Sequence, residues 1–311
     1  MNILGPDSLV FGVEDLDACN KYLGDYGLKK ADSSASGAVW EAADGTNCVV
    51  RKAADSALPS PIAPSPNIRE TVYGVADKQT LEQIGAELSK DRNVRLDAAG
   101  VLHSVDDSGI ALGFQVTIRR AYSAPLLGIN CPGQPPQRPL NVIAADHDMP
   151  IIPRTLSHVV YFVPDVHKAE KFYRDRLQFR LVDRFTTAGP FLRPAGTYDH
   201  HTLFLIQGHG PMMNGLNHFT FHVSGASELF QAGWQFFQKG YKSFWGPGRH
   251  ILGSNYFWYF NSPFGGMMEY DADMDLHDDS WVPREIPADK HTSQIFLFDY
   301  KDPWSPNKES H

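Results

Sequence analysis

The sequence predicts an α+β protein made of four βαβββ modules that pair into two domains, each an open barrel-like sheet with helices outside. The first observation is a repeated order of strand, turn, helix and strand, which begins near residues 8, 70, 157 and 217. The second is that the two copies of each pair lie about 60 residues apart, roughly the length of one βαβββ unit. The third is a stretch rich in Pro and Gly between the pairs, which is typical of a linker.

The repeated order is clearest in residues 157–185, SHVVYFVPDVHKAEKFYRDRLQFRLVDRF. Its strand, VVYFV, consists of β-branched and aromatic residues. Asp165 stands where it can cap the following helix. The apolar residues of that helix fall at helical spacing, at Ala169, Phe172, Tyr173 and Leu177. The other three copies follow the same order, so we expect the same supersecondary unit in each.

These copies predict two domains and two connecting segments. Residues 1–123 form an N-terminal, non-catalytic domain of two modules, and residues 124–154 form the linker. Residues 155–272 form the second domain, which holds the candidate metal ligands. Residues 273–311 form a C-terminal tail, for which we expect a role as a lid over the cavity or as a contact between copies of the chain.

Composition excludes several classes of partner. The net charge is −8 and the basic residues are scattered, whereas a nucleic-acid surface needs concentrated Lys and Arg. No apolar run reaches the roughly 18 residues that a membrane helix needs, and the N-terminus lacks the pattern of a signal peptide. The three cysteines include no CxxC pair. We therefore expect a cytoplasmic protein without a disulfide framework.

Two histidines occupy the same position in the third and fourth copies. His158 and His218 each lie in the first strand of their module, five residues before the Val that ends it. If the two modules are related by a pseudo-twofold axis, both imidazoles face the cavity that the sheet encloses. The corresponding residues of the first two copies are Ser8 and Glu70. The N-terminal domain therefore lacks the histidine pair, and we expect a single metal site.

The third candidate ligand is Glu269, which lies in an apolar strand after a Pro-Phe-Gly-Gly turn. An unpaired carboxylate is costly to bury there, and coordination of a divalent ion removes that cost. Two histidines and one carboxylate on one face of an octahedral ion leave three positions open, as in non-haem iron oxygenases.

Other polar residues are expected around the same cavity. His200 and His201 lie at the start of the last strand of the third copy, His250 follows a Gly-Pro-Gly-Arg turn, and Tyr259 lies in the strand that leads to Glu269. Imidazoles and a phenol beside a metal ion provide the groups that proton transfer requires.

Taken together, these features resemble the type I extradiol ring-cleavage dioxygenases of the vicinal oxygen chelate superfamily. The most specific part is GRHILGSNYFWYFNSPFGGMMEY, residues 248–270, in which Gly-Arg-His, Tyr, a Pro-x-Gly turn and Glu-Tyr follow in the family's order. The sequence Leu-x-His before a strand matches both histidine ligands, at residues 156–158 and 216–218. The resemblance covers about residues 1–123 and 155–272.

The resemblance implies that His158, His218 and Glu269 bind Fe(II), less often Mn(II). A catechol would chelate the metal, O2 would take the remaining position, and the ring would open next to the diol. His200 would be the acid–base residue, while His250 and Tyr259 would orient the substrate oxygens. The interval from His200 to His218 is a few residues longer than the family's, which leaves His201 as an alternative acid–base residue.

Several alternatives stay open at this stage. The chain could cleave a hydroquinone-type ring, act as a glyoxalase-like metal-dependent lyase or isomerase, or bind a small molecule without a metal. Trp245 is a candidate wall for an aromatic ring, and Arg249 and Arg184 are candidates to meet an acidic substituent. We also expect a homo-oligomer.

Overall fold

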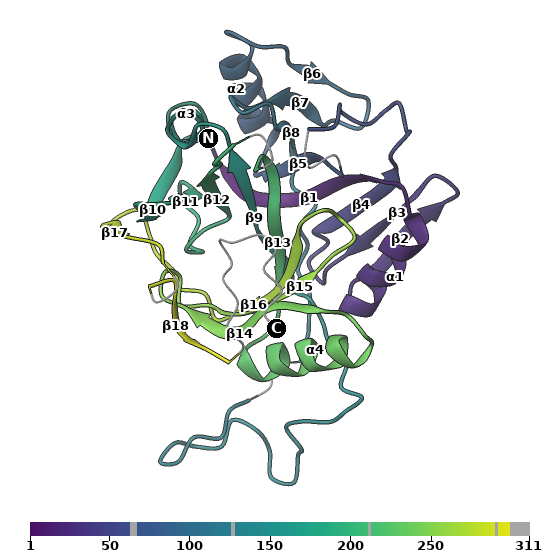
Figure 1. Cartoon of the computed structure of the whole chain (residues 1–311), viewed down its shortest axis with the longest axis vertical. Coiled ribbons are helices and arrows are strands. Elements are labelled where there is room, and N and C mark those ends of the chain that lie inside the picture. Colours follow the sequence, from purple (N-terminus) through teal and green to yellow (C-terminus); the bar gives the residue numbers. More distant parts are fainter. Residues whose placement is uncertain (63–66, 126–127, 211–212, 290–291, 299–311) are drawn as a thin grey trace.

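The chain folds into two mixed β-sheets with few helices, which confirms the predicted fold class (Figure 1). The structure is a computed structural model, which describes residues 1–62, 67–125, 128–210, 213–289 and 292–298. No helix within these ranges is both long enough and apolar enough to cross a membrane.

The first sheet contains the strands of the first two modules. These strands are β1 (Ile3–Val13), β2 (Lys29–Ser34), β3 (Gly37–Glu41), β4 (Asn47–Lys52), β5 (Ile68–Val75), β6 (Arg95–Leu96), β7 (Leu102–Val105) and β8 (Ala111–Val116). Their order in the sheet is β2-β3-β4-β1-β5-β8-β7-β6. The two modules therefore join through their first strands, because β1 and β5 pair antiparallel in the middle.

The second sheet repeats this arrangement. Its strands are β9 (Thr155–Val163), β10 (Phe179–Phe185), β11 (Gly189–Pro194), β12 (Leu203–Gln207), β13 (Gly215–His222), β14 (Ser243–His250), β15 (Tyr256–Asn261), β16 (Met267–Ala272), β17 (Arg284–Ile286) and β18 (Gln294–Leu297). Their order is β17-β10-β11-β12-β9-β13-β16-β15-β14-β18. Strands β9 and β13, which carry the two candidate histidines, thus lie side by side at its centre.

Each module has one helical segment after its first strand. These are α1 (Leu16–Tyr26), α2 (Lys78–Leu88), α3 (Val166–Lys171) with the π-helical turn Phe172–Arg176, and α4 (Ala226–Gln238). Asp15, Asp77 and Asp165 cap the first three through their side chains. At the end of α1, Gly27 adopts a left-handed φ of 113°, which favours glycine.

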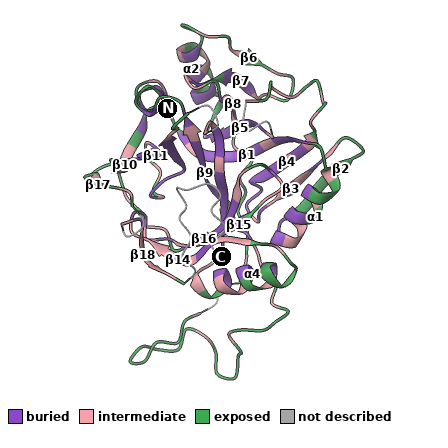
Figure 2. Cartoon of the chain, viewed as in Figure 1, coloured by how far each residue is buried: buried purple, intermediate pink, exposed green. Residues whose placement is uncertain are grey.

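Buried residues lie on the strands of both sheets (Figure 2), and side chains from both sheets contribute to one large hydrophobic cluster. Phe11 of β1 lies 5.3 Å from Phe219 of β13, measured between ring centroids. Tyr26 of α1 stacks on Tyr270 of β16 at 3.9 Å. The Tyr26 hydroxyl also donates a hydrogen bond of 2.5 Å to the backbone carbonyl of Glu269. The N-terminal half of the chain therefore supports the strand that carries the candidate carboxylate ligand.

Part of the predicted tail belongs to the second sheet. Strand β17 pairs with β10 at one edge, and β18 pairs with β14 at the other. The two strands of the tail therefore lie at opposite edges of the sheet. Residues 290–291 and 299–311 of the tail lie outside the described residues. The boundaries at residues 123, 154 and 272 stay predictions, and we propose them as the limits of two domains.

Candidate active site

Three neighbouring strands bring the candidate ligands together. His158 of β9 pairs with Thr220 of β13, and Thr220 pairs with Glu269 of β16, so one row across the sheet holds the first and last of them. His218 lies two residues before Thr220 on the same strand. Among the residues that the structure describes, one group of three or more His, Cys, Asp or Glu has ligand atoms that all lie within 4.8 Å of one another: His158, His218 and Glu269.

The spacing of the ligand atoms fits one metal ion. His158 Nε2 lies 3.3 Å from His218 Nε2 and 3.3 Å from Glu269 Oε2. His218 Nε2 lies 3.6 Å from the same carboxylate oxygen. Ligand atoms about 2.1 Å from a shared ion are about 3.0 to 3.4 Å apart when they subtend 90° to 109° at the ion. A small relaxation therefore converts this group into a coordination site.

Burial makes the carboxylate the least satisfied group of the site. Glu269 is 0% exposed, and neither of its carboxylate oxygens has a hydrogen-bond partner among the described residues. A buried charge without a partner costs on the order of several kcal/mol. A divalent cation between the two imidazoles would offset this cost, so the donor set fits such an ion.

Hydrogen bonds fix which imidazole nitrogen faces the centre. His218 Nδ1 lies 2.5 Å from the amide oxygen of Asn217, which can only accept, so Nδ1 carries the proton. His158 Nδ1 lies 3.0 Å from the hydroxyl of Ser157, which itself donates to Asp271 and therefore accepts from the imidazole. Both Nε2 atoms are left with a lone pair, as metal ligands require.

The protonation states agree with this arrangement. Burial lowers the pKa of His158 and that of His218 to about 3 each, so both imidazoles are neutral at pH 7. Burial also lowers the pKa of nearby His222, but the adjacent charge of Asp271 outweighs it and raises the pKa to about 9. A cationic His222 beside Asp271 balances the charge of that carboxylate, which lies behind the site.

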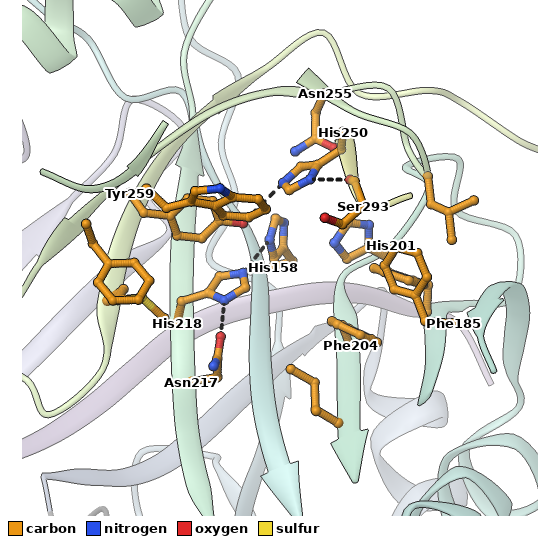
Figure 3. A pocket seen from close by; sticks show the side chains of 16 residues that line it. His158, Phe185, His201, Phe204, Asn217, His218, His250, Asn255, Tyr259 and Ser293 are labelled. Carbon is orange, nitrogen blue, oxygen red and sulfur yellow. Dashed lines mark hydrogen bonds between the residues drawn. The ribbon is translucent and has the colours of Figure 1, made fainter. Parts of the chain in front are cut away.

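The two histidines open onto a pocket (Figure 3). Its wall contains His158, Phe185, Phe191, His201, Phe204, Ile206, Asn217, His218, Phe244, Trp245, His250, Leu252, Asn255, Tyr259, Met267 and Ser293. The tail contributes Ser293, whose carbonyl lies 3.4 Å from His250 Nδ1. A wall that mixes aromatic side chains with a few convergent polar groups is typical of a small-molecule site.

Two of the predicted polar residues lie in this wall as expected. His250 Nε2 lies 3.2 Å from the Tyr259 hydroxyl and 3.7 Å from Glu269 Oε1. The Tyr259 ring is edge-on to His218, with centroids 4.9 Å apart. Burial raises the pKa of Tyr259 well above its usual value, so the phenol keeps its proton and can donate it in a hydrogen bond.

The structure separates the two adjacent histidines. His201 lies in the pocket wall, with its ring centroid 4.2 Å from that of His158, whereas His200 lies behind His201 and is not part of the wall. His200 Nε2 is 2.9 Å from Asp183 Oδ2, and the two Nδ1 atoms of His200 and His201 are 2.9 Å apart. Of the six residues predicted for the site, His158, His218, His250 and Tyr259 line the pocket, Glu269 lies behind its wall as the third candidate ligand, and His200 is replaced in the wall by its alternative, His201.

This arrangement forms a chain of three groups from the interior to the pocket. The Asp183 carboxylate can only accept, so His200 carries its proton on Nε2 and accepts from His201 Nδ1. His201 Nε2 then keeps a free lone pair. Burial lowers the pKa of His201 well below its usual value, so it is neutral at pH 7 and its Nε2 can accept a hydrogen bond.

The supporting residues were not evident from the sequence. Arg284 of β17 donates to Asp183 through its backbone N–H at 2.8 Å and through its guanidinium. The neighbours of the two ligands in the chain, Ser157 and Asn217, could have been suggested as partners of the Nδ1 atoms. Asp183, by contrast, meets His200 and Arg284 only in the folded sheet.

Comparisons with known proteins find structural relatives for nearly the whole chain and sequence relatives for part of it. Residues 155–270 match the Glyoxalase/Bleomycin resistance protein/Dioxygenase superfamily. Metapyrocatechase 2 of Cupriavidus necator is 42% identical over 125 residues, which is 40% of this chain and 38% of that protein. The chain thus matches about two fifths of the length of that curated relative.

Two solved structures show how far the fold extends. The Mn(II)-bound glyoxalase from Novosphingobium aromaticivorans has a TM-score of 0.78 at 20% identity and covers 99% of this chain and 96% of its own. The 2,3-dioxygenase LapB from Pseudomonas sp. KL28 has a TM-score of 0.72 at 17% identity and covers 92% and 98%. At these identities the likeness is one of fold, and it includes both sheets.

Proposed function

Because residues 155–270 belong to the glyoxalase/bleomycin resistance protein/dioxygenase superfamily, we propose that this chain is a type I extradiol dioxygenase. It inserts both atoms of O2 into a catechol and opens the ring next to the diol. The observation that carries the proposal is the buried, unpartnered carboxylate of Glu269 between two Nε2 lone pairs. The match to a relative named metapyrocatechase supports the catechol as substrate.

His158, His218 and Glu269 would hold the metal, for which we propose Fe(II), with Mn(II) as the alternative. Neutral imidazoles and one carboxylate suit either ion. When bound, the ion supplies the electron transfer that lets O2 react with a chelated catechol. His158 and His218 line the pocket and Glu269 lies behind them, so the diol and O2 would reach the ion from the pocket.

The remaining wall residues would bind the diol and move its protons. His201 Nε2 accepts the proton that the second hydroxyl loses on binding and returns it later in the reaction. Tyr259 and His250 hydrogen-bond the substrate oxygens and fix the ring in the pocket. His200 and Asp183 hold the tautomer of His201, so they are positioning residues.

The test combines metal content with oxygen consumption. Protein reconstituted anaerobically with Fe(II) should consume one O2 for each catechol and give a yellow, ring-opened product. His218→Ala should lose both the metal and the activity, whereas the exposed His167→Ala should keep both. Consumption of a hydroquinone but of no catechol would favour cleavage of a para-diol. Conversion of substrates without O2 uptake would favour a lyase or isomerase, and binding without conversion a metal-free binding protein.

Location and assembly are also proposals. We propose a cytoplasmic protein, which the three free cysteines support, because none of them forms a disulfide. We propose a homo-oligomer, which large exposed apolar side chains in the linker and tail support, such as Leu140 and Val282. Sedimentation of the purified chain tests the second proposal.

A further inference from the structure

We infer that the pocket selects catechols that carry an uncharged, apolar substituent and rejects those whose substituent ends in a carboxylate. This inference rests on the proposed ring cleavage and names the substrate class of that site. It follows from the apolar side chains on one side of the pocket and from the lack of Asp, Glu, Lys and Arg among the described residues of its wall.

One side of the pocket is an apolar lobe, made of Phe185, Phe191, Phe204, Ile206 and Leu252. Strands β10, β11 and β12 supply the first four of these residues. Phe191 stacks on Phe204 with ring centroids 3.9 Å apart and planes at 6°, and Phe185 meets Phe191 at 5.3 Å. Such packing of aromatic rings makes this wall of the lobe rigid.

The lobe begins beside the chemical centre. The ring of Phe191 lies 4.9 Å from that of His201, which in turn lies against His158. Figure 3 shows Phe185 and Phe204 next to His201, on the side of the centre opposite Tyr259. A catechol whose oxygens reach the ligands can therefore direct one ring substituent into the lobe.

The described part of the pocket wall holds no permanently charged side chain. None of the sixteen described residues that line it is Asp, Glu, Lys or Arg. The arginines nearby are occupied, because Arg284 binds Asp183, Arg249 binds Asp273 and Arg184 binds Glu170. The sequence-based expectation that Arg249 or Arg184 meets an acidic substituent is therefore not supported. A carboxylate in the lobe would lose its hydration without gaining a partner, which is strongly unfavourable.

The chemistry of the lobe favours a substituted ring, because an apolar substituent that enters it is removed from water and contacts apolar side chains. Each methylene that enters the lobe should raise kcat/KM about fourfold, the ratio equivalent to about 0.8 kcal/mol at 25 °C.

The decisive experiment compares 3,4-dihydroxyphenylacetate with its methyl ester, which differs mainly in charge. With the full, Fe(II)-loaded chain, we expect kcat/KM from O2 uptake to be at least about 30-fold higher for the ester, since an unpaired buried charge costs several kcal/mol. Among substrates without a charged group, kcat/KM should rise in the order catechol, 3-methylcatechol, 3-ethylcatechol. Binding is measured separately, by quenching of tryptophan fluorescence in anaerobic titrations, where the ester should again have the lower Kd.

A change in the lobe tests the same inference from the other direction. Ile206→Lys places a cation in the lobe and should reduce or reverse the preference for the ester, whereas Ile206→Met, which adds no charge, should keep it. Equal or better turnover and binding of the acid by the unaltered protein would overturn the inference. Failure to consume O2 with any catechol would instead overturn the proposed function, and the two Kd values would still decide the charge preference of the pocket.

Discussion

Replacing Glu269 with Gln should stabilise the metal-free protein and abolish its stabilisation by metal. In the metal-free state the carboxylate is buried without a partner, and Gln keeps its shape but removes the charge. Relief of about 2 kcal/mol is a modest fraction of the cost of an unpaired buried charge. A chain of 311 residues has an unfolding entropy of about 0.65 kcal/mol per degree, so Tm should rise by about 3 °C.

Glu228 provides a matched control, because it is a buried glutamate with all its partners. Its carboxylate accepts from the backbone N–H groups of Ile152 and Ser224, both at 2.9 Å, and from Arg154 at 3.2 Å. Glu228→Gln leaves Arg154 without its counter-charge and should lower stability by about 3 kcal/mol, or Tm by about 5 °C. The same chemical change is thus expected to have opposite signs at the two sites.

The assay is thermal unfolding with EDTA and with Fe(II) or Mn(II) under anaerobic conditions. At a metal concentration 100 times Kd, the unaltered protein and Glu228→Gln should each gain about 2.7 kcal/mol, or about 4 °C. Glu269→Gln should gain little. A fall in the Tm of metal-free Glu269→Gln similar to that of Glu228→Gln would refute the reasoning, because it would mean that the protein already satisfies the carboxylate.

Three further changes test other parts of the structure. His201→Ala should keep the metal and reduce kcat by about 10²- to 10⁴-fold, the usual loss when an acid–base group is removed, while a normal rate would exclude that role. Arg284→Met should lower stability by about 1 to 3 kcal/mol and should also lower kcat, because buried Asp183 loses a charged partner. Denaturant unfolding measures the first effect and O2 uptake the second. Unchanged values would show that this residue of the tail does not support the site. Asp106→Asn should raise stability at pH 8 but not at pH 4. Burial raises the pKa of Asp106 to about 6, so its ionisation in the folded state costs up to about 3 kcal/mol as pH rises from about 4 through 6. Asn removes this charge but keeps the oxygen that accepts from the backbone N–H groups of residues 108 and 110. Equal gains at both pH values in urea unfolding would contradict the assignment of the effect to this charge.

The repeat explains why so much of the fold could be predicted from the sequence. Period-two alternation in the strands and an aspartate before each of three helices are local features, and each recurs at equivalent positions. Repetition alone also relates His158 to His218, because both occupy the same position of their module. The register of the sheets bears this relation out, since His158 faces Thr220 as Ser8 faces Val72 in the first sheet.

The parts that could not be predicted depend on segments without periodicity. His200 and His201 precede β12, which begins at Leu203, so alternation along a strand does not determine which of them faces the pocket. The contact between Asp183 and Arg284 joins residues 101 positions apart. The two short strands of the tail lack an alternating pattern and form only against existing sheet edges, so the sequence showed a tail and not its place in the sheet.

The first sheet shows why its own buried acid does not create a second metal site. Glu70 takes the place of His218 in the register, and Gly113 takes that of Glu269. The Glu70 carboxylate lies 2.7 Å from His103 Nδ1, so the protein itself supplies its partner. A Cβ on Gly113 would lie 2.9 Å from the side chain of Val72, which leaves little room for a third ligand there.

We therefore predict one metal ion per chain, bound only in the second sheet. Metal analysis after reconstitution and dialysis should give a ratio near one for the unaltered protein. His103→Ala frees the Glu70 carboxylate but provides no further ligand, so the ratio should stay near one. His218→Ala removes one of three ligands and should bring the ratio near zero. Two ions per chain, or one ion that survives His218→Ala and is lost in His103→Ala, would show that the first sheet holds the metal, and that an unsatisfied carboxylate is a poor guide to the site.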